Sequence, residues 1–158
     1  MFSVRIQTED FDVSAELAAL RAGRPQVGAA CVFVGLVRDR NTVGDHGPHD
    51  PVASMELEHY PGMTEKSIAA ILERARTRFG LEGACVIHRV GLLQPTDQIV
   101  LVAVTSAHRG ASFQACEFIM DYLKSEAPFW KKEQTPQGAR WVDARTSDEL
   151  ALDKWKQL

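Results

Sequence analysis

A long apolar run at residues 27–38, VGAACVFVGLVR, restricts the fold more than any other feature of the chain. It is too short to span a bilayer as a helix, and its only charged side chain is the last one, Arg38. A strand that faces water on one side alternates apolar and polar residues, whereas a strand covered on both sides is apolar throughout. The run therefore predicts a strand that is buried on both faces.

Two amphipathic helices are predicted further along the chain. Residues 61–80 carry apolar side chains at helical spacing and end at Gly80, a residue typical of a helix C-terminus. Residues 110–126 repeat that pattern and are followed by Pro128, which cannot continue a helix. Shorter segments predict a helix at 13–22, strands at 2–7, 54–60, 84–91 and 99–107, and a β-hairpin at 129–144.

The order of these elements predicts one mixed α/β or α+β domain. We expect it to cover residues 1–145, because 158 residues suffice for a single compact core and no repeat or linker interrupts the pattern. The tail, 146–158, opens with a capping-box pattern from Thr146 to Glu149 that favours a last helix. Residues 39–51 are rich in Gly, Pro, Asp and His without periodicity, so they predict a mobile loop directly after Arg38.

Composition narrows the function without defining it. The net charge of −3 argues against a dedicated nucleic-acid binder, which usually carries a basic surplus. The N-terminus, MFSVRIQTED, lacks the basic and apolar regions of a signal peptide, and no apolar run is long enough for a membrane span. We therefore expect a cytoplasmic protein that binds neither nucleic acid nor membrane.

The sequence favours neither a disulfide nor a metal. Cys31, Cys85 and Cys116 lie far apart in apolar segments, as buried reduced thiols do. His46 and His49 have the spacing of a metal-binding pair, but their loop offers no obvious third ligand. We expect no metal and no cofactor.

Cationic residues gather where predicted strands and helices begin or end. Arg38 and the His108–Arg109 pair each end a strand, and His108–Arg109 also begins a helix, where backbone N–H groups and the helix dipole favour a phosphate. Lys124 lies near the end of that helix, and Lys131 with Lys132 follows in the hairpin. Each alone has an ordinary explanation as a solvated or capping residue. Together they indicate an α/β domain with a candidate anion pocket, and the residue pattern goes no further.

Several segments resemble the MoaE family, the large subunits of molybdopterin synthase. The two most unusual are EHYPGMTEK and the pair FIMDYLK and APFWKK, and the matches extend over residues 27–145. The matching segments are FVGLVR (33–38), LEHYPGMTEK (57–66), IHRVG (87–91), VTSAHR (104–109), FIMDYLK (118–124) and APFWKK (127–132).

The resemblance implies a fold and a reaction. The family fold is an α/β hammerhead with an added antiparallel β subdomain. Its members convert cyclic pyranopterin monophosphate to molybdopterin, taking two sulfurs from the thiocarboxylate on the C-terminal Gly-Gly of a ubiquitin-like small subunit. The large subunits form a homodimer with one small subunit at each end, which makes a heterotetramer.

The family's functional residues correspond to five positions of this chain. Arg38, His108 and Arg109 would hold the substrate's phosphate. Lys124 and Lys131 would be the catalytic residues and would also bind substrate. We expect Lys124 to move protons beside the partner's terminal carbonyl, and Lys131 to stabilise negative charge or grip the substrate.

Three apolar side chains are expected to form walls of the pocket: Phe33, Met120 and Phe129. The resemblance leaves open whether His108 and Arg109 serve their own protomer's site or the neighbour's. The loop 39–51 and the tail after Arg145 depart from the family pattern, but neither includes a matched residue.

Two other functions are compatible with parts of the sequence. A docking platform that binds a ubiquitin-like protein without turnover would not need the cationic set, and binding without product would indicate it. Another phosphate-ester enzyme would usually carry a glycine-rich phosphate loop or an acidic metal cluster, and the sequence has neither. Metal-dependent turnover of a nucleotide would indicate that enzyme.

Overall fold

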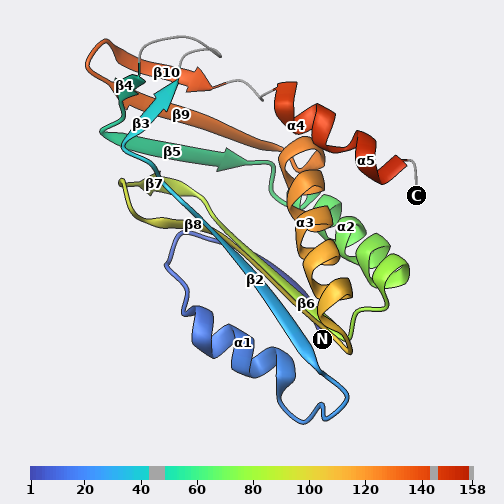
Figure 1. The fold of residues 1–158 in the computed structure, drawn as a ribbon. Helices are drawn as coiled ribbons and strands as arrows, with labels where there is room; N and C mark the ends of the chain where they lie inside the picture. Colours follow the sequence, from blue (N-terminus) through green and yellow to red (C-terminus); the bar gives the residue numbers. More distant parts are fainter. Residues whose placement is uncertain (43–48, 143–145, 157–158) are drawn as a thin grey trace.

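The structure is a computed structural model of the chain and describes residues 1–42, 49–142 and 146–156. A four-stranded sheet with helices on both faces forms the larger part of the molecule (Figure 1). Its strands, in spatial order, are β1 (Phe2–Gln7), β6 (Gly83–Arg89), β8 (Gln98–Ser106) and β2 (Ala29–Leu36). β1 runs parallel to β6, and the other two pairs are antiparallel.

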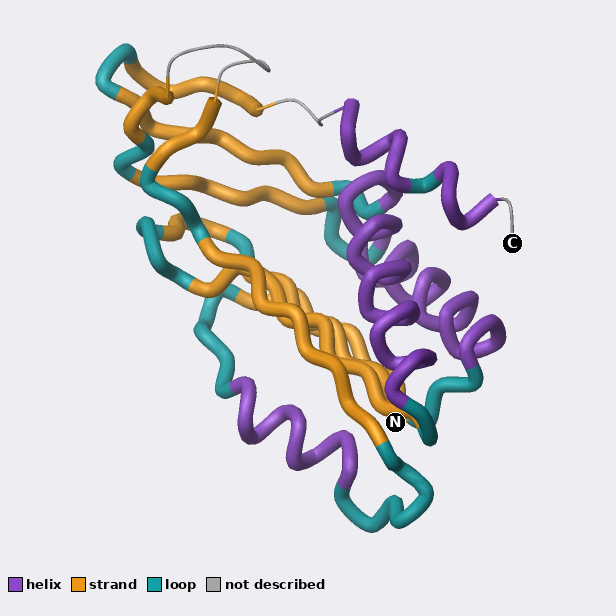
Figure 2. The backbone as a smooth tube through the Cα atoms, viewed as in Figure 1, coloured by secondary structure: helices purple, strands orange, loops and turns teal. Residues whose placement is uncertain are grey.

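Helices bury this sheet from both sides, as Figure 2 shows. One face carries α1 (Val13–Arg21), and the other carries α2 (Met63–Phe79) and α3 (Arg109–Glu126). Along β8, Val102 and Val104 belong to the core cluster under α2 and α3, while Leu101 and Ala103 belong to the cluster under α1. Successive side chains of a strand point to opposite faces, so a strand covered on both faces is apolar at every position.

The prediction of burial on both faces was wrong for residues 27–38. β2 is an edge strand, and Phe33 and Leu36 are 40% and 54% exposed. An edge strand is hydrogen-bonded on one side only, and the helices cover it incompletely. Part of this apolar run, residues 33–36, instead lines the cavity described below.

A second four-stranded sheet continues from one end of the first. Its strands, in spatial order, are β10 (Gly138–Val142), β9 (Phe129–Thr135), β5 (Ser54–His59) and β7 (Gly91–Leu93), all antiparallel. The predicted hairpin at 129–144 is confirmed in its described part as β9 and β10. β7 was not predicted; it follows β6 after one residue, where Gly91 adopts a φ of 84° that favours glycine.

The predicted loop 39–51 contains two short strands, so the prediction of an irregular segment was wrong there. β3 (Arg40–Thr42) pairs antiparallel with β4 (His49–Pro51). Strands of three residues are too short to leave a recognisable alternation in the sequence. Residues 43–48, with His46, lie outside the described residues.

The C-terminal segment forms two short helices, α4 (Thr146–Ala151) and α5 (Asp153–Lys156), and α5 is anchored to the core. Trp155 is buried, with its ring edge-on to Phe118 and Phe79 at centroid distances of 5.3 and 6.0 Å. Its indole Nε1 donates a hydrogen bond of 2.8 Å to Asp121 Oδ2 on α3. The segment after the second sheet therefore returns to α2 and α3.

The remaining predicted elements are confirmed with small shifts of their ends. In α2, Gly80 provides the left-handed C-terminal residue, and its N–H donates to the carbonyl of Arg76 at 3.0 Å. Within the parts of the chain that the structure describes, none of the helices is long and apolar enough to cross a bilayer.

We predict that Trp155→Ala lowers the free energy of unfolding by about 3–5 kcal/mol, because it removes a buried aromatic side chain and leaves Asp121 without its donor. Trp141→Ala is the matched control, since Trp141 is 55% exposed, and it should cost far less. Urea titration of both variants measures the difference. Equal losses would show that α5 does not stabilise the core.

Candidate functional site

A cavity of about 640 Å³ lies where the two sheets and the end of α3 meet. We call it the junction cavity. Its polar side chains are Arg38, His88, Lys124, Lys131, Glu133 and Asp148. Its apolar side chains are Phe33, Val34, Leu36, Met55, Ile99, Val100, Met120, Leu123, Ala127, Phe129 and Val142.

Three of the predicted cationic residues reach this cavity from different elements. Arg38 follows β2, Lys124 lies in the last turn of α3, and Lys131 lies on β9. The three predicted wall residues line the same cavity: Phe33, Met120 and Phe129. Segments nearly a hundred residues apart in sequence therefore form one partly apolar, cationic site.

Strand alternation explains which hairpin side chains face the cavity. Phe129, Lys131 and Glu133 are spaced by two along β9 and all line it. Lys132 points to the other face, where its Nζ lies 5.6 Å from the centre of the Trp141 ring. The two adjacent lysines therefore have different surroundings, which the sequence alone did not separate.

Hydrogen bonds hold the turn between α3 and β9 in place. The hydroxyl of the fully buried Thr64, near the start of α2, donates to the carbonyl of Pro128 at 3.0 Å. The same oxygen accepts a hydrogen bond of 3.1 Å from the backbone N–H of Tyr60. These contacts fix the geometry of the chain between Lys124 and Lys131.

Two carboxylates balance part of the positive charge, and sequence reasoning missed both. Glu133 is only 1% exposed and lies 3.3 Å from Arg140 Nη2. Asp148, on α4, lies 3.8 Å from Lys124 Nζ, and its carbonyl accepts a hydrogen bond from the Ser125 hydroxyl. The alternation along β9 could have indicated Glu133, whereas no sequence signal places α4 beside Lys124.

His88 also faces the junction cavity, although it was not among the predicted site residues. Its ring stacks on Phe129, with centroids 3.8 Å apart and planes at 18°. Burial is the largest cause that lowers its pKa to about 4; the nearby Lys131 and His59 add to this effect, and the hydrogen bond with the Arg89 carbonyl opposes it. His88 is therefore neutral at physiological pH.

The structure places His108 and Arg109 away from the junction cavity. Both are exposed at the N-terminal end of α3, and Lys124 lies in its last turn. Fifteen residues of helix separate Arg109 from Lys124, which corresponds to roughly 22 Å along the axis. The predicted pair therefore does not join the other cations within one chain.

The thiols stay outside the cavity. Cys85 and Cys116 are buried and reduced, as predicted, whereas Cys31 is partly buried. Burial, together with the neighbouring Cys31, raises the pKa of Cys116 to about 12. Among the described residues, no cluster of three or more His, Cys, Asp or Glu side chains could hold a metal ion.

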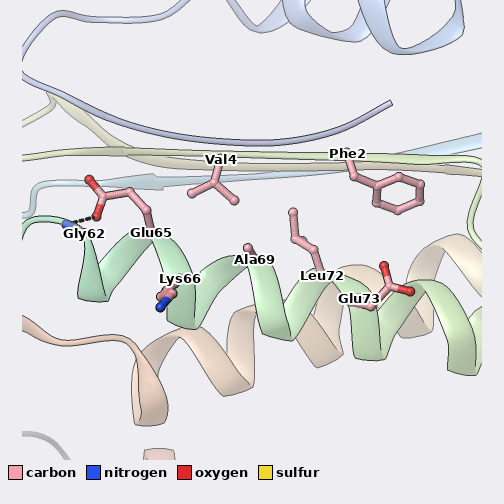
Figure 3. Close-up of a pocket in the computed structure, with 8 residues that line it drawn as sticks. All are labelled: Phe2, Val4, Gly62, Glu65, Lys66, Ala69, Leu72 and Glu73. Atoms are coloured by element: carbon pink, nitrogen blue, oxygen red, sulfur yellow. Dashed lines mark hydrogen bonds between the residues drawn. The ribbon is translucent and has the colours of Figure 1, made fainter.

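A second hollow, of about 500 Å³, lies between β1 and α2 (Figure 3). None of the predicted site residues lines it. Its cation, Lys66, is accompanied by Glu65 and Glu73, and the carboxylate of Glu65 accepts a hydrogen bond from the N–H of Gly62 at the start of α2. The cationic junction cavity is therefore the better candidate for an anionic substrate.

The family model, the similar sequences and the similar solved structures all indicate the same family. The model of the MoaE protein family matches residues 6–126. A molybdopterin synthase catalytic subunit from Ralstonia nicotianae is 64% identical over 155 residues, which are 98% of this chain and 85% of the relative. The solved structure of a molybdopterin biosynthesis MoaE protein from Burkholderia ambifaria has 55% identity and a TM-score of 0.82, covering 99% of both chains.

A more distant structure has the same fold. It is a chain of the complex of subunits 1 and 2 of molybdopterin-converting factor from Helicobacter pylori. It is 19% identical, has a TM-score of 0.71, and the match covers 90% of this chain and 91% of that one. The fold expected from the sequence resemblance is thus confirmed.

The lowered pKa of His88 predicts a specific loss of stability in acid. Between its unfolded pKa of about 6.5 and its folded pKa of about 4, the unfolded chain binds a proton that the folded chain does not. Stability is therefore complete above about pH 6.5 and falls as the pH is lowered. From pH 7 to pH 5 this group alone should cost about 2 kcal/mol.

His88→Phe keeps an aromatic ring against Phe129 but cannot titrate. Urea titrations at pH 7 and pH 5 should show a smaller acid loss for this variant than for the wild type. Identical losses would mean that His88 is already protonated in the folded state or is not buried from solvent.

Proposed function

The chain belongs to the MoaE family, and from this premise we propose that it is the catalytic subunit of a molybdopterin synthase, a sulfurtransferase of molybdenum cofactor biosynthesis. Its reaction converts cyclic pyranopterin monophosphate to molybdopterin. The observation that carries the proposal is the convergence of Arg38, Lys124 and Lys131 on one partly apolar cavity. We expect the reaction to take place in the cytoplasm.

The sulfur donor in this proposal is a ubiquitin-like small subunit whose C-terminal Gly-Gly ends in a thiocarboxylate. The similar Helicobacter pylori chain is part of a complex of two subunits, which supports a second subunit here. A glycine tail has no side chains, so it would need little space between apolar residues such as Phe33, Met120 and Phe129, which line the cavity. The terminal thiocarboxylate would then meet the cationic groups inside.

The three cations suit different parts of this chemistry. Arg38 would bind the phosphate through its planar pair of donors. Lys124, at the end of α3 and half exposed, would donate to the acyl carbonyl and move protons between the reacting groups and solvent. Lys131, on β9, would stabilise the negative charge that develops when sulfur is transferred.

His108 and Arg109 fit the proposal if two copies of the chain associate. Their distance from the cavity of their own chain and their exposure at the start of α3 support a role in a neighbouring protomer's site. Phe113, one turn further along α3, is 63% exposed, and an exposed aromatic ring beside a cationic pair is typical of an interface. We propose a homodimer in which each chain supplies this pair to its partner's cavity.

The adjacent lysines of β9 provide a direct test. Lys131→Ala should lower the rate of dithiolene product formation about 100-fold or more, because it removes a donor from the cavity, whereas Lys132→Ala should stay close to the wild type. Lys124→Ala should lose activity to a similar extent. The assay combines the purified chain, thiocarboxylated small subunit and cyclic pyranopterin monophosphate.

The outcomes separate the alternatives. Product from the wild type and from Lys132→Ala only would support the proposed roles. Equal product from all variants would retain the synthase and remove the lysines from its mechanism. If the wild type binds the small subunit and makes no product, the chain is a docking platform.

Mixing two inactive variants tests the shared site. In a mixed dimer of Lys124→Ala and Arg109→Ala chains, one cavity has both defects and the other has none. Random reassociation should therefore restore about a quarter of wild-type activity, since half of the dimers are mixed and each has one intact site. No recovery after subunit exchange, verified by mass spectrometry, would show that Arg109 acts within its own chain or not at all.

A further inference from the structure

The imidazole of His88 is held in one orientation and one tautomer. It lies next to the end of β6, and its ring stacks on Phe129. Its Nδ1 lies 2.8 Å from the backbone carbonyl oxygen of Arg89. A carbonyl oxygen can only accept, so Nδ1 carries the hydrogen and Nε2 presents a lone pair.

That lone pair is open to the junction cavity. His88 lines the cavity, and the hydrogen bond of its ring with a described residue is made by Nδ1. No fully buried side-chain nitrogen or oxygen of the described residues lacks a hydrogen-bond partner. Nε2 therefore lies at the cavity surface, where an incoming molecule can reach it.

The surroundings keep this imidazole neutral. The titratable groups that lower its pKa by their charge are Lys131 on β9 and His59 on β5, and two further cations, Arg38 and Lys124, line the same cavity. The carboxylates that line the same cavity are engaged, Glu133 with Arg140 and Asp148 with Lys124. Burial, with smaller contributions from Lys131 and His59, lowers the pKa of His88 to about 4, so its Nε2 remains an acceptor above that pH.

His88 offers a neutral side-chain acceptor, whereas the other acceptor side chains that line the cavity are the ion-paired carboxylates of Glu133 and Asp148. Arg38, Lys124 and Lys131 can only donate, which suits phosphate and thiocarboxylate but not a donor group. We propose that His88 is a specificity-determining residue, whose Nε2 accepts a hydrogen bond from an N–H or O–H group of the pterin substrate. The inference rests on the proposed function, because it deepens the assignment of the same cavity.

Such a contact orients the substrate rather than holding its charge. The cations fix the phosphate end, and one fixed acceptor on the ring end selects the rotation that presents the reacting carbons to the thiocarboxylate. A cyclic phosphate without a pterin ring would contact the cations but not Nε2 of His88. Discrimination between such molecules would therefore depend on His88.

Two substitutions separate the acceptor from the shape of the ring. His88→Phe preserves the stacking on Phe129 but has no lone pair, whereas His88→Gln can place an amide oxygen near the position of Nε2. For cyclic pyranopterin monophosphate, His88→Phe should raise the Kd and KM about tenfold, and His88→Gln should recover most of that loss. Inorganic phosphate, used as a probe of the cations alone, should bind all three proteins equally.

Nitrogen NMR of labelled histidine in the wild-type protein gives a readout that does not depend on turnover. The Nε2 resonance of His88 should be that of an unprotonated nitrogen at pH 7, and cyclic pyranopterin monophosphate should shift it as a hydrogen-bond acceptor, while inorganic phosphate should not. Thermal unfolding of each variant at pH 7 shows whether the fold is retained.

The outcomes distinguish this inference from the proposed function. Wild-type turnover with unchanged Kd and KM in His88→Phe, or an Nε2 resonance that substrate does not move, overturns the role of His88 and leaves the synthase in place. Weakened binding in both variants without rescue by glutamine overturns the acceptor role as well. If the wild type neither binds nor converts the pterin, the proposed function fails, and this inference fails with it.

Discussion

Burial of the first sheet on both faces is the constraint on which the site depends. The central strands β6 and β8 send alternate side chains to α1 and to the pair α2 and α3, so the helices must lie along the sheet rather than across its end. α3 therefore carries Lys124 to the edge where the second sheet begins. Arg38 and His88 reach that junction from the ends of β2 and β6, and Lys131 reaches it from β9. The cavity between them can be cationic because Glu133 and Asp148 offset part of the repulsion.

The main elements of the fold could be predicted because each carries a local signal. The amphipathic pattern and Gly80 indicated α2, and Pro128 indicated the end of α3. The position of β2 could not be predicted, since an apolar strand that lines a cavity has the same composition as one covered on both faces. The three-residue strands β3, β4 and β7 are defined by their hydrogen-bonded partners, and a single sequence does not show those partners.

The candidate site was predictable where a motif marked it. The resemblance brought together Arg38, Lys124 and Lys131, and the structure places all three in one cavity. His88 lies in a matching segment, IHRVG, but a histidine in an apolar strand has the same pattern whether it is structural or faces a ligand. Asp148 depends on the return of the C-terminal segment to α3, which is held by the buried Trp155. Packing between segments that are far apart in the chain leaves no recognisable pattern in the sequence of either segment.

The burial of Cys85 and Cys116 has a consequence for the proposed transfer of sulfur. A thiolate beside an acyl-sulfur intermediate would attack its carbonyl carbon, form a dead-end thioester and release the sulfur as a thiolate or hydrosulfide. Cys85 is enclosed in the core, and Cys116, with a pKa near 12, keeps its proton at neutral pH. In the proposed reaction, neither Cys85 nor Cys116 would therefore capture the sulfur that passes from the donor to the pterin.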